Sequence, residues 1–211
     1  MSLRNDDALI DSIIKRYPRS RSAIMPLLHL AQARDGYVTP ESIEVIAEKL
    51  SLETAEVSAV ATFYTQYKRK PVGEYHVGVC TNTLCAVMGG DAIFSALKEH
   101  LGIENDGVTA DGKVSLEHIE CNAACDYAPV VMANWEFYDN QTVESAKALV
   151  DGARAGNPPA PTRGPNRLVT YKQASAVLAG LDDGLAGEGV QAGSATLLGL
   201  GIARTAEKGG K

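Results

Sequence analysis

The sequence predicts an α+β fold: a bundle of short helices at the N-terminus, then a small α/β domain, then an extended C-terminal tail. Three observations predict this order. Apolar residues recur at helical spacing through about residue 70, strand-like runs separated by an amphipathic segment follow, and glycine, alanine and proline dominate after residue 150. We therefore divide the chain into residues 1–73, 74–150 and 151–211.

Residues 1–73 are expected to form four helices of roughly ten residues each. The second should end at Gly36, which suits a left-handed C-cap, and the third should begin at Thr39 with proline at the first helical position. Ser51 is expected to cap the fourth helix. Because this segment has no cysteine and only one histidine, His29, we interpret it as a packing module.

Residues 74–150 alternate between strand and helix patterns. Strands are predicted over residues 75–79, 114–119 and 130–135. An amphipathic helix is predicted over residues 89–101, and Thr142 should cap a last helix that runs through residue 150. This order of strand, helix, two strands and helix is compatible with a thioredoxin-like sandwich.

Residues 151–211 have a loose composition, with 12 glycines, 11 alanines and 4 prolines. Such a segment buries too little apolar area to offset the entropy of ordering it. We expect a disordered tail or an arm that orders on a partner. The apolar anchors suited to the second possibility are Leu168-Val169, Val177-Leu178 and Leu197-Leu198 with Leu200.

The charge distribution excludes several classes of protein. The net charge of −6 divides into +1 for residues 1–73, −9 for residues 74–150 and +2 for residues 151–211, so the middle segment cannot present a basic face to nucleic acid. No apolar run approaches the roughly 20 residues that span a bilayer, so membrane association is expected through partners only. Acidic residues stand where a secretory signal would be basic, which predicts a cytoplasmic chain with reduced cysteines.

All four cysteines lie in the acidic middle segment, as two close pairs at predicted strand ends. The spacing is Cys80-x4-Cys85 and Cys121-x3-Cys125. A reducing compartment disfavours disulfides, and neither pair is the Cys-x-x-Cys of a thioredoxin-type redox site. A structural zinc site stays open, although zinc loops commonly have two intervening residues on at least one side.

A 2Fe-2S cluster fits the two pairs better, because each tetrahedral iron takes two thiolates and two bridging sulfides. We expect Cys80 and Cys85 to hold one iron, and Cys121 and Cys125 the other. Backbone N–H groups and hydroxyls of residues 81–84 can donate to cluster sulfur. No catalytic residue is predicted in this chain.

Three segments carry a resemblance to a known family: residues 79–85 (VCTNTLC), 108–114 (VTADGKV) and 120–129 (ECNAACDYAP). They resemble the NuoE family, the thioredoxin-like 2Fe-2S subunits of respiratory complex I (NADH:quinone oxidoreductase). The resemblance covers about residues 8–150. It implies a helical bundle joined to a thioredoxin-like 2Fe-2S domain whose ligands are Cys80, Cys85, Cys121 and Cys125.

Two features depart from the family pattern. Family members usually have Leu-Gly where this chain has Asn122 and Ala123, which leaves the ligands intact but changes the backbone of the second cysteine loop. The segment after residue 150 also exceeds the family core, so the resemblance implies nothing about its role.

The resemblance implies a one-electron carrier within a complex on the inner face of the plasma membrane. Its partners would be a subunit that binds FMN and NADH and an adjacent large iron–sulfur subunit. This chain has no Gly-x-Gly-x-x-Gly fingerprint, so flavin and nucleotide are expected in another chain. The alternatives are the equivalent subunit of an NAD-linked hydrogenase or formate dehydrogenase, and a structural zinc-binding adaptor.

Overall fold

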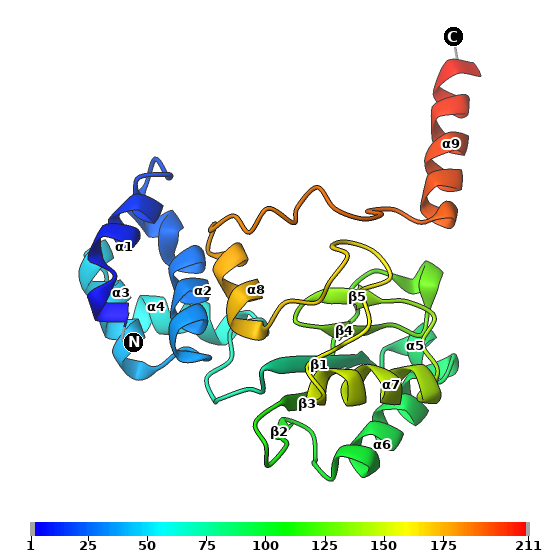
Figure 1. Cartoon of the computed structure of the whole chain (residues 1–211). Coiled ribbons are helices and arrows are strands. Elements are labelled where there is room, and N and C mark those ends of the chain that lie inside the picture. The colour runs from blue at the N-terminus through cyan, green and yellow to red at the C-terminus, as the bar shows by residue number, and fades with distance from the viewer. Residues whose placement is uncertain (1–2, 210–211) are drawn as a thin grey trace. The chain divides into compact units, whose positions relative to one another are not determined.

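The structure, a computed structural model, describes residues 3–209 and divides into two compact units (Figure 1). The helical unit comprises the residues up to Tyr75 together with Val169–Asp183. The sheet unit comprises His76–Leu168 and the residues from Gly184 onward. The α+β class that the sequence predicts is confirmed.

The helical unit contains the four predicted helices and one more from the C-terminal segment. Short 3-10 turns precede α1 and α2. The elements are the 3-10 turns Leu3–Asn5 and Ser20–Ala23, and the helices α1 (Asp7–Ile14), α2 (Ile24–Asp35), α3 (Pro40–Leu50), α4 (Thr54–Phe63) and α8 (Tyr171–Leu178).

Two predicted helix ends are confirmed. Gly36 closes α2 with a φ of 83°, a left-handed conformation that costs glycine little. The Thr39 side chain caps α3 by accepting a hydrogen bond from the backbone N–H of Ser42 at 3.0 Å, and Pro40 occupies the first turn.

The predicted cap at Ser51 is wrong. Ser51 ends α3 instead, with a φ of 54° and its N–H directed to the carbonyls of Ala47 and Glu48. The cap of α4 falls two residues later, where the Glu53 N–H donates to the Glu56 carboxylate at 3.1 Å. A serine can serve either helix end, and here the preceding helix holds its backbone.

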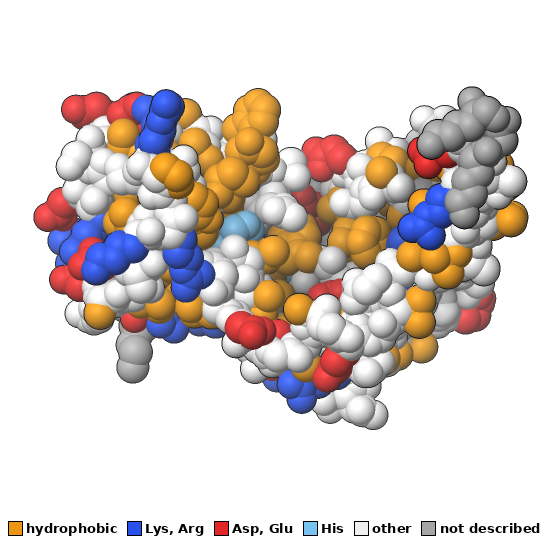
Figure 2. Space-filling view, turned by 90° about the horizontal axis from the view of Figure 1, so that it is seen from above, with side chains coloured by type: hydrophobic (Ala, Val, Ile, Leu, Met, Phe, Trp, Pro, Cys, Tyr) orange, Lys and Arg blue, Asp and Glu red, His pale blue; other side chains and the backbone are white. Residues whose placement is uncertain are grey.

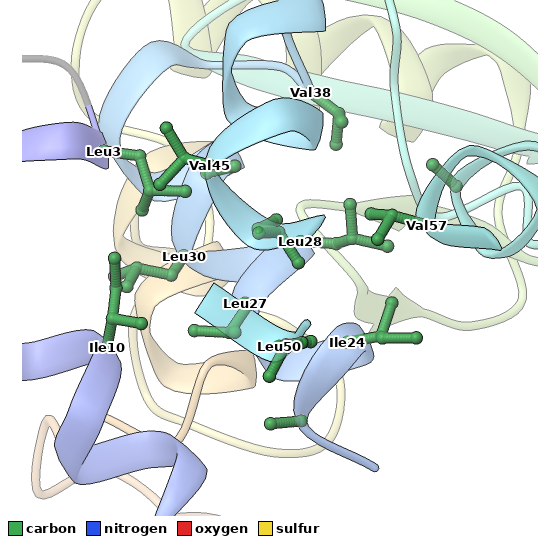
Figure 3. Packing of buried hydrophobic residues seen from close by; sticks show 14 of the residues in the cluster. Leu3, Ile10, Ile24, Leu27, Leu28, Leu30, Val38, Val45, Leu50 and Val57 are labelled. Carbon is green, nitrogen blue, oxygen red and sulfur yellow. The ribbon is translucent and has the colours of Figure 1, made fainter. Parts of the chain in front are cut away.

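The core of the helical unit is one cluster of mostly aliphatic side chains from the 3-10 turns, from α1 to α4 and from the residue that follows α8 (Figure 3). Helix α8 packs against α2, Ala179 at its C-terminal end is buried in the cluster, and Tyr171 at its first position is 1% exposed. Hydrogen bonds from Arg16 to the Gly180 carbonyl (2.8 Å) and from Lys172 to the Arg34 carbonyl (2.9 Å) fix both of its ends. This helix lies within the expected tail and was not predicted from the sequence.

The sheet unit is a five-stranded sheet in the order β2-β3-β1-β4-β5 with helices packed on it (Figure 1). Its antiparallel pairs are β2 with β3, β1 with β4, and β4 with β5. The elements are β1 (Tyr75–Cys80), α5 (Thr83–Val87), α6 (Gly90–Leu101), β2 (Gly107–Val108), β3 (Val114–Ile119), a 3-10 turn (Cys125–Tyr127), β4 (Val131–Ala133), β5 (Glu136–Tyr138), α7 (Val143–Arg154) and α9 (Ser194–Gly209).

Strands β1 and β3 run parallel. Their contacts advance in the same direction along both strands. The His76 ring lies 2.9 Å from the Ser115 hydroxyl and 3.0 Å from the Glu117 carboxylate, and a Cβ placed on Gly78 would lie 2.7 Å from the Ile119 side chain. The connection between them passes through α5 and α6, as a parallel pair requires.

The predicted strand over residues 130–135 is a hairpin instead. Asn134 (φ 48°) and Trp135 (φ 74°) form a two-residue turn between β4 and β5. The Asn134 side chain accepts from the His76 N–H at 2.7 Å, which holds the turn. A tryptophan at positive φ is not a recognisable turn signal, so β5 was not predicted from the sequence.

Strands β1 and β3 and helices α6 and α7 follow the prediction closely, whereas α5, β2 and α9 were not predicted from the sequence. Thr142 caps α7 by accepting from the Ser145 N–H at 3.2 Å, and α7 runs four residues beyond residue 150. Figure 2 shows lysine and arginine side chains on the helical unit, interspersed with aspartate and glutamate. Among residues 3–209, no helix is both long enough and apolar enough to cross a bilayer.

We expect the stability of the helical unit to depend on pH through His29. Burial lowers the pKa of His29 from 6.5 to about 4, so protonation favours the unfolded chain. Stability is therefore complete above pH 6.5 and falls as the pH drops toward 4, by up to about 3 kcal/mol. Denaturant unfolding of the wild type and of His29→Gln between pH 7 and pH 4 measures this, and equal pH slopes would contradict it.

Candidate metal centre

The parallel pairing of β1 and β3 brings the four cysteines to the end of the sheet at which both strands finish. Cys80 is the last residue of β1, and Cys121 follows the end of β3 by two residues. The carboxyl ends of parallel neighbours meet at the same edge. The Asn82 amide ties the two loops by donating to the Ile119 carbonyl at 3.0 Å.

The first pair, Cys80 and Cys85, is buried, with 2% and 3% exposure. Cys85 lies in α5, and α6 begins directly over this loop. A Cβ placed on Gly90 would lie 2.4 Å from the Cys80 carbonyl oxygen and 2.9 Å from that of Cys85. Only glycine permits this approach, so the positive N-terminal end of α6 lies against the loop that carries both thiols.

The second pair, Cys121 and Cys125, is exposed, and its two sulfurs lie 3.6 Å apart. Thiolates that share a tetrahedral metal at about 2.3 Å are about 3.8 Å apart, so this pair is spaced to bind one ion together. The Ala123 N–H donates to the Cys121 sulfur at 3.4 Å.

The two pairs also interact with one another. Burial, together with the neighbouring Cys80 and Cys125, raises the pKa of the Cys85 thiol to about 11. The contact with Cys121 raises the pKa of Cys125, and Cys80 adds to this effect. Cys85 and Cys125 therefore favour the protonated form beside the other thiols, and a bound metal must displace their protons.

The donor set fits a two-iron cluster. Within the described part of the chain, no three His, Cys, Asp or Glu side chains are grouped to hold a single ion. The thiols lie as one buried and one exposed pair, and the two irons of a 2Fe-2S cluster each take two thiolates. Cys80 and Cys85 could hold one iron, and Cys121 and Cys125 the other.

One donor near the thiols was not predicted from the sequence. The Asn82 amide nitrogen lies 4.0 Å from the Cys80 sulfur, in addition to its bond to the Ile119 carbonyl. The sequence indicated only backbone and hydroxyl donors in residues 81–84. Asn82 precedes α5, but its side chain makes no cap hydrogen bond there, so no local pattern in the sequence indicates this contact.

The second cysteine loop is strained at Ala123, which has a φ of 55°. This is the position where the family resemblance places glycine. A left-handed alanine costs about 1 kcal/mol, and the conformation is what turns its N–H toward the Cys121 sulfur. Ala123 therefore adopts the left-handed conformation that glycine adopts at lower cost.

The third motif, residues 108–114, builds the β2–β3 turn. The Asp111 carboxylate accepts from the Thr109 hydroxyl (2.5 Å), the Lys113 N–H (3.0 Å) and the Arg154 guanidinium (2.9 Å). The Thr109 hydroxyl leads these contacts in lowering the pKa of Asp111 to about 2. All of these contacts lie in the turn or with α7, so the motif has a structural role.

The fold and the paired thiols define a class of protein, the thioredoxin-like iron–sulfur electron carriers. Residues 10–154 match the family model described as thioredoxin-like [2Fe-2S] ferredoxin. The chain belongs to this family, whose cofactor is a 2Fe-2S cluster. The resemblance noted in the sequence is thus confirmed.

Its relatives bear the name of the E subunit of NADH-quinone oxidoreductase. The proteins of Mycobacterium bovis and Mycobacterium tuberculosis are 62% identical over 193 residues, covering 91% of this chain and 76% of theirs. The protein of Rickettsia bellii is 45% identical over 150 residues, covering 70% of this chain and 90% of its own. Such relatives are subunits of an oxidoreductase, so partner subunits are implied.

A solved structure shares the fold. The air-oxidised NAD+-reducing [NiFe]-hydrogenase aligns with a TM-score of 0.57 at 21% identity, over 64% of this chain and 23% of the hydrogenase chain. This chain therefore spans less than a quarter of that protein. At this identity the likeness concerns the fold alone.

We expect the protein to be about equally stable with glycine or alanine at position 123 and clearly less stable with valine. Ala123→Gly removes the strain but adds chain entropy of a similar size, so the unfolding free energy should change by less than about 1 kcal/mol. Ala123→Val places a β-branched residue at positive φ and should destabilise the loop by more than about 1 kcal/mol. Thermal unfolding tests this order, and a valine variant as stable as the wild type would contradict it.

Proposed function

We propose that this chain is the electron-transfer subunit of an NADH:quinone oxidoreductase, exchanging single electrons between its 2Fe-2S cluster and the flavin of a partner subunit. The observation that carries the proposal is the meeting of two thiol pairs at one sheet edge in a chain of this family. The cluster ligands in this proposal are Cys80, Cys85, Cys121 and Cys125.

The cluster supplies a one-electron store, and the chain controls its surroundings. Burial of Cys80 and Cys85 excludes water from one side of the site. The Asn82 amide and the Ala123 N–H lie near cysteine sulfurs, and the N-terminal end of α6 lies against the backbone of the first cysteine loop. Their positive partial charge favours the reduced form. The net charge of −9 on residues 74–150 opposes it, although salt screens exposed carboxylates.

The partner is proposed to dock on α5. Three large apolar side chains of the first cysteine loop are exposed: Leu84 (44%), Val87 (79%) and Met88 (56%). They flank Cys85, so an apolar surface that covers them approaches the cluster closely. Apolar residues exposed together commonly mark an interface. We assign this surface to the subunit that binds FMN and NADH.

The remaining assignments concern the complex. An adjacent large iron–sulfur subunit is the proposed second partner. We propose that the complex lies on the cytoplasmic face of the plasma membrane. Attachment to the membrane then comes through other subunits. The acidic sheet unit supports the absence of a nucleic-acid partner.

The equivalent subunit of an NAD-linked hydrogenase or formate dehydrogenase would use the same chemistry with other partners. The 62% identity to the mycobacterial NADH-quinone oxidoreductase subunits favours the quinone-reducing complex. A zinc adaptor would be colourless, whereas a 2Fe-2S protein absorbs visible light.

Replacing Cys121 by Ala should abolish stable cluster binding, because one iron would keep a single protein thiolate. The helical unit has its own core, so it should stay folded while the sheet unit loses stability. Iron and acid-labile sulfide content, together with helical circular dichroism, measure this. Wild-type amounts of sulfide with an unchanged spectrum would overturn the four-ligand assignment.

Electron transfer from NADH should require the flavoprotein, because this chain has no recognisable nucleotide-binding motif. The loaded chain alone should leave NADH unoxidised, and the partner should permit NADH to bleach the cluster. Val87→Glu should slow this bleaching at least fivefold by opposing docking at α5, with the spectrum of the free chain unchanged.

Met25→Glu is the matched control, because Met25 is 40% exposed in the helical unit. It should leave the bleaching rate at the wild-type value. Equal rates for Val87→Glu and the wild type would exclude the α5 surface, and NADH oxidation by the pure chain would reveal a catalytic site that we do not predict.

A further inference from the structure

Part of the C-terminal segment returns to the second cysteine loop. We call residues 159–166 and 188–193 the C-terminal strap. It lies beyond residues 10–154, which match the family model. The mycobacterial relatives match 91% of the chain, so that match must include most of the residues after 154. The strap is therefore an addition to the family core that these relatives share.

The first half of the strap is fixed to β5. Arg163 forms an isolated β-bridge with Phe137, and the Thr162 N–H donates to the Phe137 carbonyl at 2.9 Å. The Tyr138 hydroxyl donates to the Pro159 carbonyl at 2.8 Å. The strap thus extends the sheet edge beside the 3-10 turn that begins at Cys125.

Arg163 is the centre of these contacts. Its guanidinium carbon lies 4.2 Å from the ring centre of Phe137 and 5.4 Å from that of Tyr127, and its Nη2 lies 2.9 Å from the Asp139 carboxylate. The Arg163 and Asp139 side chains are 17% and 8% exposed. A planar cation between two rings, paired with a buried carboxylate, is a geometry that arginine provides better than lysine.

The second half of the strap closes over the same turn. The Gly164 N–H donates to the Val190 carbonyl at 2.9 Å. A Cβ placed on Gly193 would lie 1.9 Å from the Tyr127 hydroxyl, so a side chain there would displace the ring. In α9, the Thr196 hydroxyl donates to the Asp126 carboxylate at 3.1 Å. Both residues that follow Cys125 are therefore held by the C-terminal segment.

We propose that Arg163 is a positioning residue for Cys125. By contacting the rings of both Tyr127 and Phe137 it ties the turn Cys125–Tyr127, on the exposed side of the thiol site, to β5. Phe137 packs on the buried cluster of side chains that includes Cys80 and Cys85, so Arg163 joins the exposed side of the site to its buried side. The inference rests on the proposed function, because it requires Cys125 to be a cluster ligand.

Loss of the clamp should loosen the exposed pair. Arg163→Gln removes the cation from both rings and leaves the nearly buried Asp139 carboxylate without this partner. Cys125 would then leave its iron more often, and the cluster would exchange faster with competitors in solution. The electronic structure of the cluster should change as well, because the direction of the Cys125 sulfur is no longer fixed.

The test uses the full-length chain with its cluster assembled. The variants are Arg163→Gln, Arg163→Lys and, as a matched control, Arg167→Gln, which removes the same charge from an exposed residue four positions away. Two quantities are measured: the rate at which visible absorbance is lost to an iron chelator, and the electron paramagnetic resonance spectrum of the dithionite-reduced protein.

We expect Arg163→Gln to lose absorbance about tenfold faster than the wild type, with shifted g-values. Arg163→Lys should be intermediate in both measurements, and Arg167→Gln should match the wild type. A general loss of folding would not shift the g-values of the intact clusters. Wild-type rates and g-values in Arg163→Gln would overturn the inference.

If Arg163→Gln does not fold, Gly193→Ala decides the question, because it displaces Tyr127 from the other side. Faster absorbance loss with shifted g-values supports the clamp, and wild-type behaviour overturns it. A wild-type chain that binds no iron and sulfide would overturn the proposed function itself, so the two failures are distinguishable.

Discussion

The parallel pairing of β1 with β3 is the constraint on which the thiol site depends. It places Cys80 and Cys121 at the same end of the sheet, although about forty residues separate them in the chain. The crossover through α5 and α6 then has two consequences. It buries the first pair of thiols, and it brings the N-terminal end of α6 onto their loop through Gly90.

The two thiol pairs are held in different ways. Strand and helix backbone fix the buried pair, whereas the exposed pair lies in a loop that contains a strained alanine and a single 3-10 turn. The C-terminal segment supplies what this loop lacks, through Arg163 on its aromatic rings and Thr196 on Asp126. The same segment contributes α8 to the helical unit, so it serves both units of the fold.

Local patterns were enough to predict most elements and the four cysteines. Helix ends were predicted at Thr39, Gly36 and Thr142, and the structure has caps there, because capping depends on neighbours in sequence. Features fixed by distant contacts were missed. The turn at Trp135 depends on a bond between Asn134 and β1, and α8 depends on packing against α2 that its composition does not reveal. Arg163 likewise gains its role only from residues of β5 and the second cysteine loop.

The central claim is that the two thiol pairs hold one 2Fe-2S cluster. Iron and acid-labile sulfide analysis of the purified full-length chain, combined with a reductive titration of its visible absorbance, tests this most directly. We predict two irons and two sulfides per chain, with absorbance that bleaches on uptake of one electron. A colourless chain that contains one zinc ion and no sulfide would contradict the claim.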